Sequence, residues 1–218
     1  MKAPADTEVE LFGLARSVYT RIARLVLEEK RVPYALTEVE IFGPAGVPKE
    51  HLARHPFGRI PVLRHGERSL YETAAITRYV DEAFDGPALQ PADAGQRAQM
   101  NQVIGLLDAY AYRPLVWGVW VQRVRVPLNG GVPDEALIAA SMSTARTCLG
   151  ALATLMSAAP YFAGHGVSLA DLHAYPMLRY FALAPEGGAM LSRHPNLQRW
   201  YEGMRERRSV ARTLSPLE

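Results

Sequence analysis

The chain has 218 residues, of which 49% are hydrophobic and 21% are charged, and its formal net charge is +2. This composition is typical of a soluble globular protein with one large or two small domains, and the small net charge argues against nucleic acid as a partner. The single cysteine, Cys148, excludes an internal disulfide and an all-cysteine metal site.

The sequence shows no signal for membrane insertion or export. No run of about 18 consecutive apolar residues is present. Residues 1–6 lack the apolar core of a signal peptide. We therefore expect a cytoplasmic protein without a membrane partner.

The first half of the chain alternates between strand and helix patterns. In chain order the patterns predict a strand at 9–13, a helix from 17 to Pro33, a strand at 32–39, a short helix at 49–54, and a hairpin of 60–64 with 69–71. A last helix follows, with apolar residues at i, i+3, i+4, i+7 and i+8 from Ile76 and with Thr73 as its expected N-cap. The order βαβ then αββα predicts a mixed four-stranded sheet with helices.

The hairpin begins at Ile60-Pro61, where the two signals conflict. Proline lacks the N–H of a sheet ladder, so it belongs at the first position of a strand or at an edge. Either the strand begins at Pro61, or the Ile60-Pro61 bond is cis within a defined turn. In both cases we expect the backbone groups of Ile60 to be free to pair with a ligand.

The second half of the chain is predicted to be helical. A proline-rich connection after position 85 separates two expected domains, at 7–85 and 94–218. The helical tracts cover 96–125 with a bend at Pro114, 134–156, a helix beginning at Ser168, and 195–207. Ser168 and Asp171 have the spacing of a capping box, which is structural.

Several of these stretches together resemble the cytosolic glutathione transferases. They are Leu11-Phe12-Gly13 leading to Ser17-Val18-Tyr19-Thr20-Arg21, Leu27-Glu28-Glu29-Lys30, His55-Pro56-Phe57-Gly58-Arg59-Ile60-Pro61-Val62, Tyr71-Glu72-Thr73-Ala74-Ala75-Ile76, and the capping box at Ser168. The resemblance implies an α/β, thioredoxin-like first domain and an all-α second domain. The spacing around Ser17 looks closest to the serine-type classes phi and theta, phi above all, in a bacterial-type member.

The resemblance also implies a site for glutathione. The cysteinyl backbone of glutathione would pair with Ile60, before Pro61, and its γ-glutamyl carboxylate would bind Thr73 at a helix N-terminus, where anions are favoured. Glu72 would bind the γ-glutamyl ammonium group. From the residues alone, Thr73 is explained equally well as an N-cap and Glu72 as a surface charge.

Ser17 would donate a hydrogen bond to the glutathione sulfur, and Tyr19 is the alternative donor, since other classes of the family use tyrosine. A free thiol has a pKa of about 8.5, and lowering it by about two units requires about 2.7 kcal/mol in favour of the thiolate. A hydroxyl donor and the positive end of a helix supply energy of that order. By itself, Ser17 is also explained as a simple N-cap.

Other contacts follow from the resemblance. The glycine end of glutathione needs a cation, for which Lys49 and His51 are candidates, while Arg59 would contribute its backbone. The electrophile pocket between the domains would be lined by Leu14, Tyr110, Arg113, Trp117 and Trp120. For Trp117 and Trp120 we favour the alternative that they are core residues at helical spacing.

Two positions depart from the family pattern. Related phi-like chains commonly carry arginine where this chain has Ala74, so the polar network there is weakened or is rebuilt by Arg78 or Asp108. No cysteine lies near position 17, although members with thiol-transfer or dehydroascorbate reductase activity need one there. Cys148 is expected to be a small buried apolar residue.

The expected function is conjugation of glutathione, as its thiolate, to a small apolar electrophile, and possible further reactions include glutathione-dependent peroxide reduction, dehalogenation and isomerisation. The alternative is a non-catalytic glutathione-binding or interaction module on the same fold. Glutathione is the expected co-substrate, with no metal. The resemblance also implies a homodimer.

Overall fold

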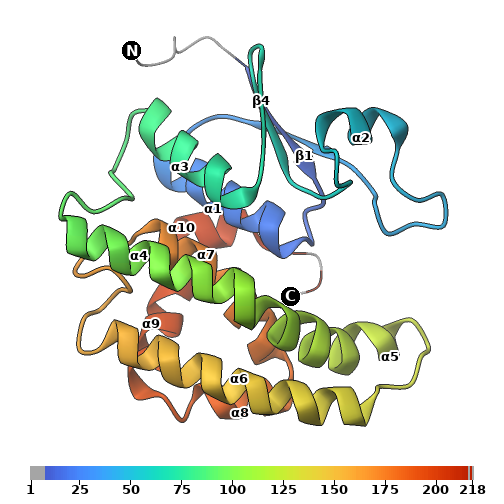
Figure 1. Cartoon of the computed structure of the whole chain (residues 1–218), viewed down its shortest axis with the longest axis vertical. Helices are drawn as coiled ribbons and strands as arrows, with labels where there is room; N and C mark the ends of the chain where they lie inside the picture. Colours follow the sequence, from blue (N-terminus) through green and yellow to red (C-terminus); the bar gives the residue numbers. More distant parts are fainter. Residues whose placement is uncertain (1–7, 216, 218) are drawn as a thin grey trace. The chain divides into compact units, whose positions relative to one another are not determined.

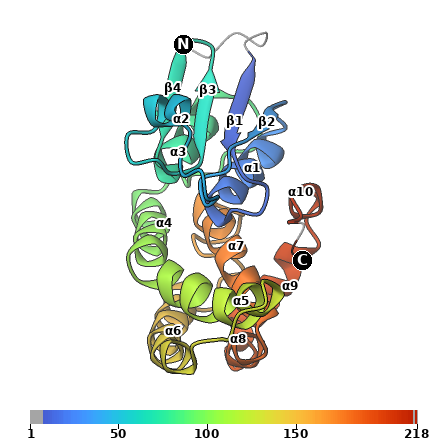
Figure 2. The same cartoon turned by 90° about the vertical axis from the view of Figure 1, so that its right-hand side faces the viewer.

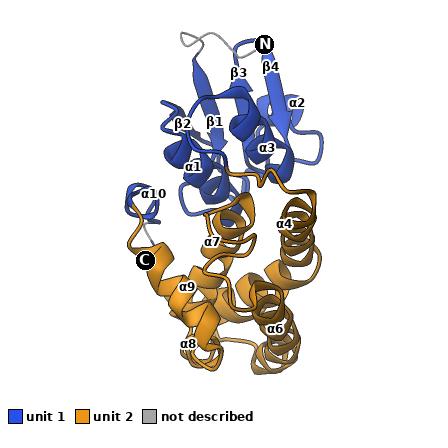
Figure 3. Cartoon of the chain, turned by 90° about the vertical axis from the view of Figure 1, so that its left-hand side faces the viewer, with its two compact units in different colours: residues 1–88, 208–218 blue, residues 89–207 orange. Residues whose placement is uncertain are grey.

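The computed structural model describes residues 8–215 and 217, which form two compact units. Unit 1 is Met1–Ala88 with Arg208–Glu218, and unit 2 is Leu89–Arg207 (Figure 3). The units differ from the predicted domains, 7–85 and 94–218, because helix α10 (Arg208–Arg212) groups with unit 1. Ser209 Oγ donates to Glu29 at 2.5 Å and Arg212 Nε to Glu28 at 2.5 Å, so α10 is bonded to α1 (Val18–Lys30).

Unit 1 has the predicted βαβ-αββα order. Its strands are β1 (Val9–Gly13), β2 (Ala35–Glu38), β3 (Val62–His65) and β4 (Arg68–Tyr71), and its other helices are α2 (Lys49–Arg54) and α3 (Thr73–Ala83). The strands lie in the order β2-β1-β3-β4, with β1 parallel to β2 and antiparallel to β3 (Figure 2). In Figure 1 the helix α2 lies on one side of this sheet, and α1 and α3 lie on the other. The predicted mixed four-stranded sheet is confirmed.

The apolar stripes of the sequence form the core of unit 1. Ile22 and Leu25 of α1 and Ile76 and Val80 of α3 are fully buried, as is Leu11 of β1. Burial of each such side chain contributes about 1.5–3 kcal/mol relative to exposure. The period of the apolar residues therefore predicted correctly which face of α1 and of α3 is buried.

One helix start differs from the prediction. The N-cap of α3 is Glu72, and Thr73 is the first helical residue, so the assignment of Thr73 as N-cap is wrong by one position. The reason is the backbone of Glu72, whose φ of 69° and ψ of 112° turn the chain sharply between β4 and α3.

Unit 2 is built from helices. They are α4 (Ala94–Leu106), η1 (Leu107–Ala111), η2 (Arg113–Arg125), α5 (Val126–Leu128), α6 (Glu135–Met156), α7 (Leu169–Leu183), α8 (Pro185–Leu191) and α9 (Pro195–Arg205). Helix α4 is followed by π-helix from Leu107 onward, before Pro114 is reached, and η1 and η2 have i to i−5 hydrogen bonds such as Tyr112 N–H to Leu107 O. Pro114 lies in the first turn of η2, and the bend at this residue stays a prediction. The predicted all-helical architecture is confirmed.

Helix α6 has an unusual composition. Among the described residues it alone is long and apolar enough, with a mean hydropathy of 1.3, to cross a membrane by those two criteria. One such helix is weak support for a span, because long helices of globular units pass the same test. The buried residues Ala145, Leu149 and Leu152 recur along one face of α6, as expected for packing within a helical unit.

Candidate functional site

Ser17 lies at the start of α1, directly after the loop that leaves β1. It is the N-cap, with φ −76° and ψ 132°, and its Oγ accepts a hydrogen bond of 3.4 Å from the N–H of Thr20. The hydroxyl proton of Ser17 is not used by any hydrogen bond of the described residues. Ser17 therefore combines a partly buried hydroxyl donor with the positive end of a helix of 13 residues. Tyr19, the alternative donor, lies inside α1 and is also partly buried.

The Ile60-Pro61 peptide bond is cis, which confirms one of the two alternatives, and β3 begins after it at Val62. Ile60 packs in a buried cluster with Phe12, Leu14 and Val62. Its backbone N–H and carbonyl are not hydrogen-bonded to any of residues 8–215 and 217. The turn thus presents peptide groups that a peptide ligand can pair with, as expected from the sequence.

Glu72 and Thr73 form the corner between β4 and α3. Glu72 has the positive φ of 69°, which is rare for a non-glycine residue and costs of the order of 1–3 kcal/mol. Its side chain is exposed and makes no capping hydrogen bond. The N–H groups of Thr73 and Ala74 have no acceptor within the described part of the chain. A strained backbone and unpaired N–H donors at a helix N-terminus are suited to binding an anionic group of a ligand, here beside the carboxylate of Glu72.

The two candidate cations for the glycine end of glutathione, Lys49 and His51, differ in their exposure to solvent. Lys49 is exposed at the start of α2. His51 is fully buried, and its Nε2 lies 2.7 Å from the carbonyl oxygen of Arg59, to which it donates. His51 is therefore not presented to solvent; it fixes the backbone beside Ile60. The side chain of Arg59 is exposed.

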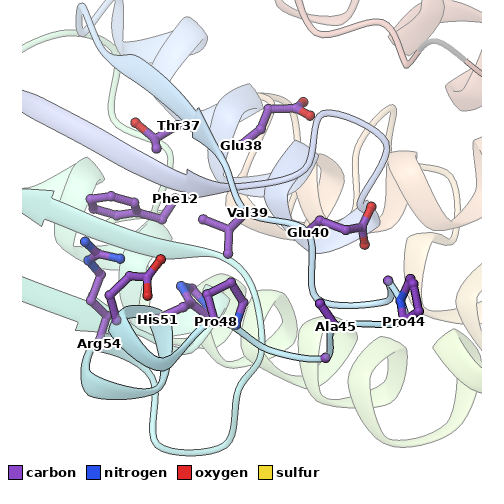
Figure 4. Close-up of a pocket in the computed structure, with 13 residues that line it drawn as sticks. Phe12, Thr37, Glu38, Val39, Glu40, Pro44, Ala45, Pro48, His51 and Arg54 are labelled. Carbon is purple, nitrogen blue, oxygen red and sulfur yellow. The ribbon is translucent and has the colours of Figure 1, made fainter.

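A cavity of about 510 Å³ lies in unit 1 beside α2 (Figure 4). Its wall includes the ring of Phe12 and three carboxylates, Glu38, Glu40 and Glu50, against the single guanidinium of Arg54. Glu40 is itself paired with Arg16, but Glu38 and Glu50 still outnumber the one guanidinium of the wall, and this excess of negative charge disfavours a carboxylate ligand. The cavity is therefore a poor place for the glycine end of glutathione.

His55 is a residue of this corner that the sequence analysis left without a role. His55 is 2% exposed, and the centroid of its ring lies 4.8 Å from that of Tyr71, the residue before Glu72. Burial lowers the pKa of His55, while the charge of Glu72 opposes that shift. The only signal for His55 in the sequence was the position of a titratable ring shortly before the Ile60-Pro61 turn.

The predicted electrophile residues of unit 2 come from η1 and η2. Tyr110 is 67% exposed and Trp117 42% exposed, and Arg113 is exposed as well. Trp120 is 3% exposed and stacks on Tyr180 at 4.1 Å. The core interpretation is thus confirmed for Trp120 and wrong for Trp117, because the two side chains leave the helix in different directions.

The remaining predicted residues have other partners. Leu14, in unit 1, is 2% exposed and belongs to the buried cluster around Ile60. Arg78 Nη1 donates to the carbonyl oxygen of Ala74 at 3.1 Å, so an arginine does reach this corner from the next turn of α3. Asp108 Oδ1 pairs with His173 Nε2 at 2.8 Å within unit 2.

Two observations in the described part of the chain bear on metal and cysteine chemistry. Within residues 8–215 and 217, no group of three or more His, Cys, Asp or Glu side chains could hold a metal ion. The single cysteine, Cys148, is 4% exposed, as expected, and burial raises the pKa of its thiol.

Comparison with known proteins identifies relatives across nearly the whole chain. Residues 11–88 match the family model for the glutathione S-transferase N-terminal domain, and residues 135–203 match that for the C-terminal domain. Glutathione S-transferase F10 of Arabidopsis thaliana is 31% identical over 188 residues, 85% of this chain and 86% of the relative. Glutathione S-transferase 4 of Zea mays is 29% identical over 203 residues, with coverage of 93% and 90%.

Two solved structures of glutathione S-transferases are similar to this chain over nearly its whole length. The apo form of glutathione S-transferase III superimposes with a TM-score of 0.83 at 26% identity, covering 96% of this chain and 97% of the other. Glutathione S-transferase I from mais in complex with an atrazine glutathione conjugate gives a TM-score of 0.82 at 26% identity, with coverage of 94% and 96%.

Proposed function

This chain belongs to the glutathione S-transferase family, and on that premise we propose that it is a serine-type glutathione transferase in which Ser17 activates the thiol of glutathione. The hydroxyl proton of Ser17, unused within the described residues, carries this proposal. A hydrogen bond from that proton stabilises the thiolate relative to the thiol. The N-terminus of α1 adds a positive potential at the same point.

The other contacts bind glutathione in an extended form. The backbone of Ile60, before cis-Pro61, pairs with the cysteinyl peptide group, and the neighbouring Arg59 contributes its backbone. The N–H groups at Thr73 bind the γ-glutamyl carboxylate, and Glu72 binds the ammonium group. Lys49 is the exposed cation for the glycine carboxylate, whereas His51 acts indirectly, by holding the Arg59 carbonyl.

The reaction is attack of the thiolate on an electrophilic carbon of a small apolar molecule, which forms a thioether by addition or with departure of a leaving group. With an organic hydroperoxide, the thiolate attacks an oxygen, the O–O bond breaks and an alcohol leaves, and a second glutathione converts the resulting sulfenic acid into glutathione disulfide and water. Tyr110, Arg113 and Trp117, exposed on unit 2, are the side chains proposed to contact the electrophile. We further propose that the protein is a cytoplasmic homodimer, as is typical of the family, and a bacterial-type member of it.

The decisive experiment compares the ultraviolet absorbance of bound glutathione in the wild type with that in Ser17→Ala and Tyr19→Phe. A thiolate band at neutral pH that is lost in Ser17→Ala and kept in Tyr19→Phe supports activation by Ser17. A band that survives Ser17→Ala but not Tyr19→Phe assigns the role to Tyr19. If glutathione does not bind to the wild type, the transferase function itself is refuted.

A further inference from the structure

Residues 14–16 form the loop between β1 and α1, the Ser17 loop, whose position decides where the hydroxyl of Ser17 lies. The N–H of Ser17 donates to the carbonyl oxygen of Leu14 at 2.9 Å, across this loop. The hydroxyl oxygen of Ser17 accepts a weak bond, because 3.4 Å from the nitrogen of Thr20 is beyond the usual hydrogen-bond range. The contacts of the loop therefore fix the hydroxyl more than the first turn of α1 does.

The chain that leaves β2 lies beside the Ser17 loop. β1 and β2 are parallel, and Gly13, the last residue of β1, is paired with Glu38, the last residue of β2. The N–H of Val39 donates to the carbonyl oxygen of Gly13 at 3.2 Å, so the alignment continues past the strand ends. Residues 14–16 and residues 38–40 therefore follow the two strands at the same edge of the sheet.

The core side and the solvent side of the Ser17 loop are held by different residues. On the core side, Leu14 packs in the buried cluster that contains Val39. On the solvent side, the backbone N–H of Ala15 donates to Oε1 of Glu38 at 3.2 Å, and Glu38 is exposed. Figure 4 shows the side chains of Glu38 and Val39 on opposite sides of the chain that leaves β2, as expected for successive residues of an extended chain. One carboxylate thus ties a peptide N–H of the loop to the end of β2.

Arg16, the last residue of the Ser17 loop, is held separately. Its Nη2 donates to Oε2 of Glu40 in an ion pair, and the same carboxylate accepts the N–H of Phe42 at 2.8 Å. Both ends of the loop therefore have contacts of their own. The contact that depends on Glu38 is the peptide group in the middle of the loop.

The charge of Glu38 and its hydrogen bond have opposite consequences for a thiolate beside Ser17. A negative charge nearby disfavours the thiolate and raises the pKa of the thiol. No ion pair neutralises Glu38 within residues 8–215 and 217. A hydroxyl held in good hydrogen-bonding geometry favours the thiolate and lowers the pKa. Removing the charge and removing the hydrogen bond therefore shift the pKa of the thiol in opposite directions.

We propose that Glu38 is a positioning residue, whose hydrogen bond to the N–H of Ala15 holds the Ser17 loop so that the hydroxyl of Ser17 donates to the sulfur of glutathione. The inference rests on the proposed function, since it needs glutathione at Ser17. Glu38 acts at the backbone two residues before Ser17. Small displacements matter, because an error of about 1 Å in the placement of a catalytic group lowers rates by as much as about a hundredfold.

Two conservative variants of Glu38 separate position from charge. Glu38→Asp keeps the carboxylate, but its side chain is one methylene shorter and cannot reach the N–H of Ala15 without moving the loop. Glu38→Gln keeps an oxygen acceptor at the same reach and removes the charge. The matched control is Glu10→Asp, which shortens another carboxylate of the sheet, one that is bonded to Thr37 and Arg64.

The readout is the pKa of the thiol of bound glutathione, followed by the ultraviolet absorbance of the thiolate between about pH 5 and pH 9. We expect Glu38→Asp to raise this pKa by about one unit, a part of the lowering of about two units that activation requires. Glu38→Gln should leave the pKa at or below the wild-type value, and Glu10→Asp should leave it unchanged. The affinity for S-methylglutathione, which has no thiol, should be the same in all four proteins, because the proposed contacts at Ile60 and Thr73 remain.

A double variant tests whether Glu38 acts through Ser17. In the Ser17→Ala background, Glu38→Asp should raise the pKa of the thiol no further, because the donor that the loop positions is already absent. A rise of the same size in both backgrounds would show that Glu38 acts on the thiolate by another route, and it would refute the proposal.

The remaining outcomes separate this inference from the proposed function. If Glu38→Asp is folded, as judged by thermal unfolding, and keeps the wild-type pKa of the thiol, the role of Glu38 is refuted and the glutathione site stands. If Glu38→Gln raises the pKa as much as Glu38→Asp does, the hydrogen bond to Ala15 is not what matters, and the role is refuted as well. If the wild type binds no glutathione, or binds it without a thiolate band, the proposed function fails, and the inference fails with it.

Discussion

The side chain of Asp171 in unit 2 accepts four hydrogen bonds, and its replacement by asparagine should be strongly destabilising. It is fully buried at the start of α7. Oδ1 accepts from Phe162 N–H at 3.0 Å and Trp200 Nε1–H at 2.8 Å, and Oδ2 accepts from the N–H of Ser168 at 2.8 Å and from its hydroxyl at 2.7 Å. All four partners are donors.

The magnitude follows from what asparagine cannot do. Its carbonyl oxygen can replace one carboxylate oxygen, but its amide group would face the N–H of Ser168, donor to donor. A buried group left unsatisfied costs about 1–3 kcal/mol, and the loss of a hydrogen bond to a charged group about 1.5–3 kcal/mol. We therefore expect Asp171→Asn to lose about 3–5 kcal/mol of a total stability of about 5–15 kcal/mol.

The assay is urea unfolding at neutral pH, followed by tryptophan fluorescence, since Trp200 is itself bonded to Asp171. Ser168→Ala is the matched control: it removes the hydroxyl from the same capping box but leaves the carboxylate, so a loss of about 0.5–2 kcal/mol is expected. If Asp171→Asn loses less than Ser168→Ala, the carboxylate is not the group that holds Phe162, Ser168 and Trp200 together.

Three further predictions concern other buried positions. Lys30→Met removes the buried ammonium group that lies 3.1 Å from the carboxylate of Asp81, and it should cost about 3 kcal/mol in urea unfolding. Arg212→Met, at a more exposed ion pair, should cost less than about 1 kcal/mol, and equal losses would contradict this reasoning. Gly187→Ala places a Cβ 1.9 Å from the Phe181 carbonyl oxygen and should lower stability by about 2–3 kcal/mol. The Cβ of Gly203→Ala meets no atom of a neighbouring element within 4 Å, so this control should raise stability by about 0.5–1 kcal/mol. Thermal unfolding of both variants tests the comparison, and an unchanged stability of Gly187→Ala would refute the steric reason. Cys148 should react with a thiol reagent at least about tenfold more slowly in the native protein than in urea, because burial both shields the thiol and raises its pKa, and equal rates would show that the site is open.

Much of the fold follows from local sequence alone. The stripes that contain Ile22, Leu25, Ile76 and Val80 repeat with the period of a helix, and a period identifies the buried face without knowledge of what covers it. The capping box at Ser168 and the N-cap at Ser17 are equally local, since both bonds span three residues. Such features depend on neighbours along the chain, so a sequence pattern suffices to predict them.

The predictions that were wrong, and the features that were missed, depend on contacts between segments that are distant in the sequence. Trp117 and Trp120 have the same spacing signal, but Trp117 is 42% exposed, whereas Trp120 is 3% exposed and stacks on Tyr180 of another helix. The helix start at Glu72 shifted by one because its positive φ is imposed by the junction of β4 with α3 rather than by residue type.

By itself, the sequence determined the order of the elements, the turn at Ile60-Pro61 and the resemblance that points to glutathione. Only the tertiary structure decided that His51 is buried against the Arg59 carbonyl, that His55 packs beside Tyr71, and that the cavity near α2 is lined by carboxylates. The physical reason is that charge and burial are properties of what lies nearby in space. A pattern along one chain segment carries no information about the neighbours that another segment brings to it.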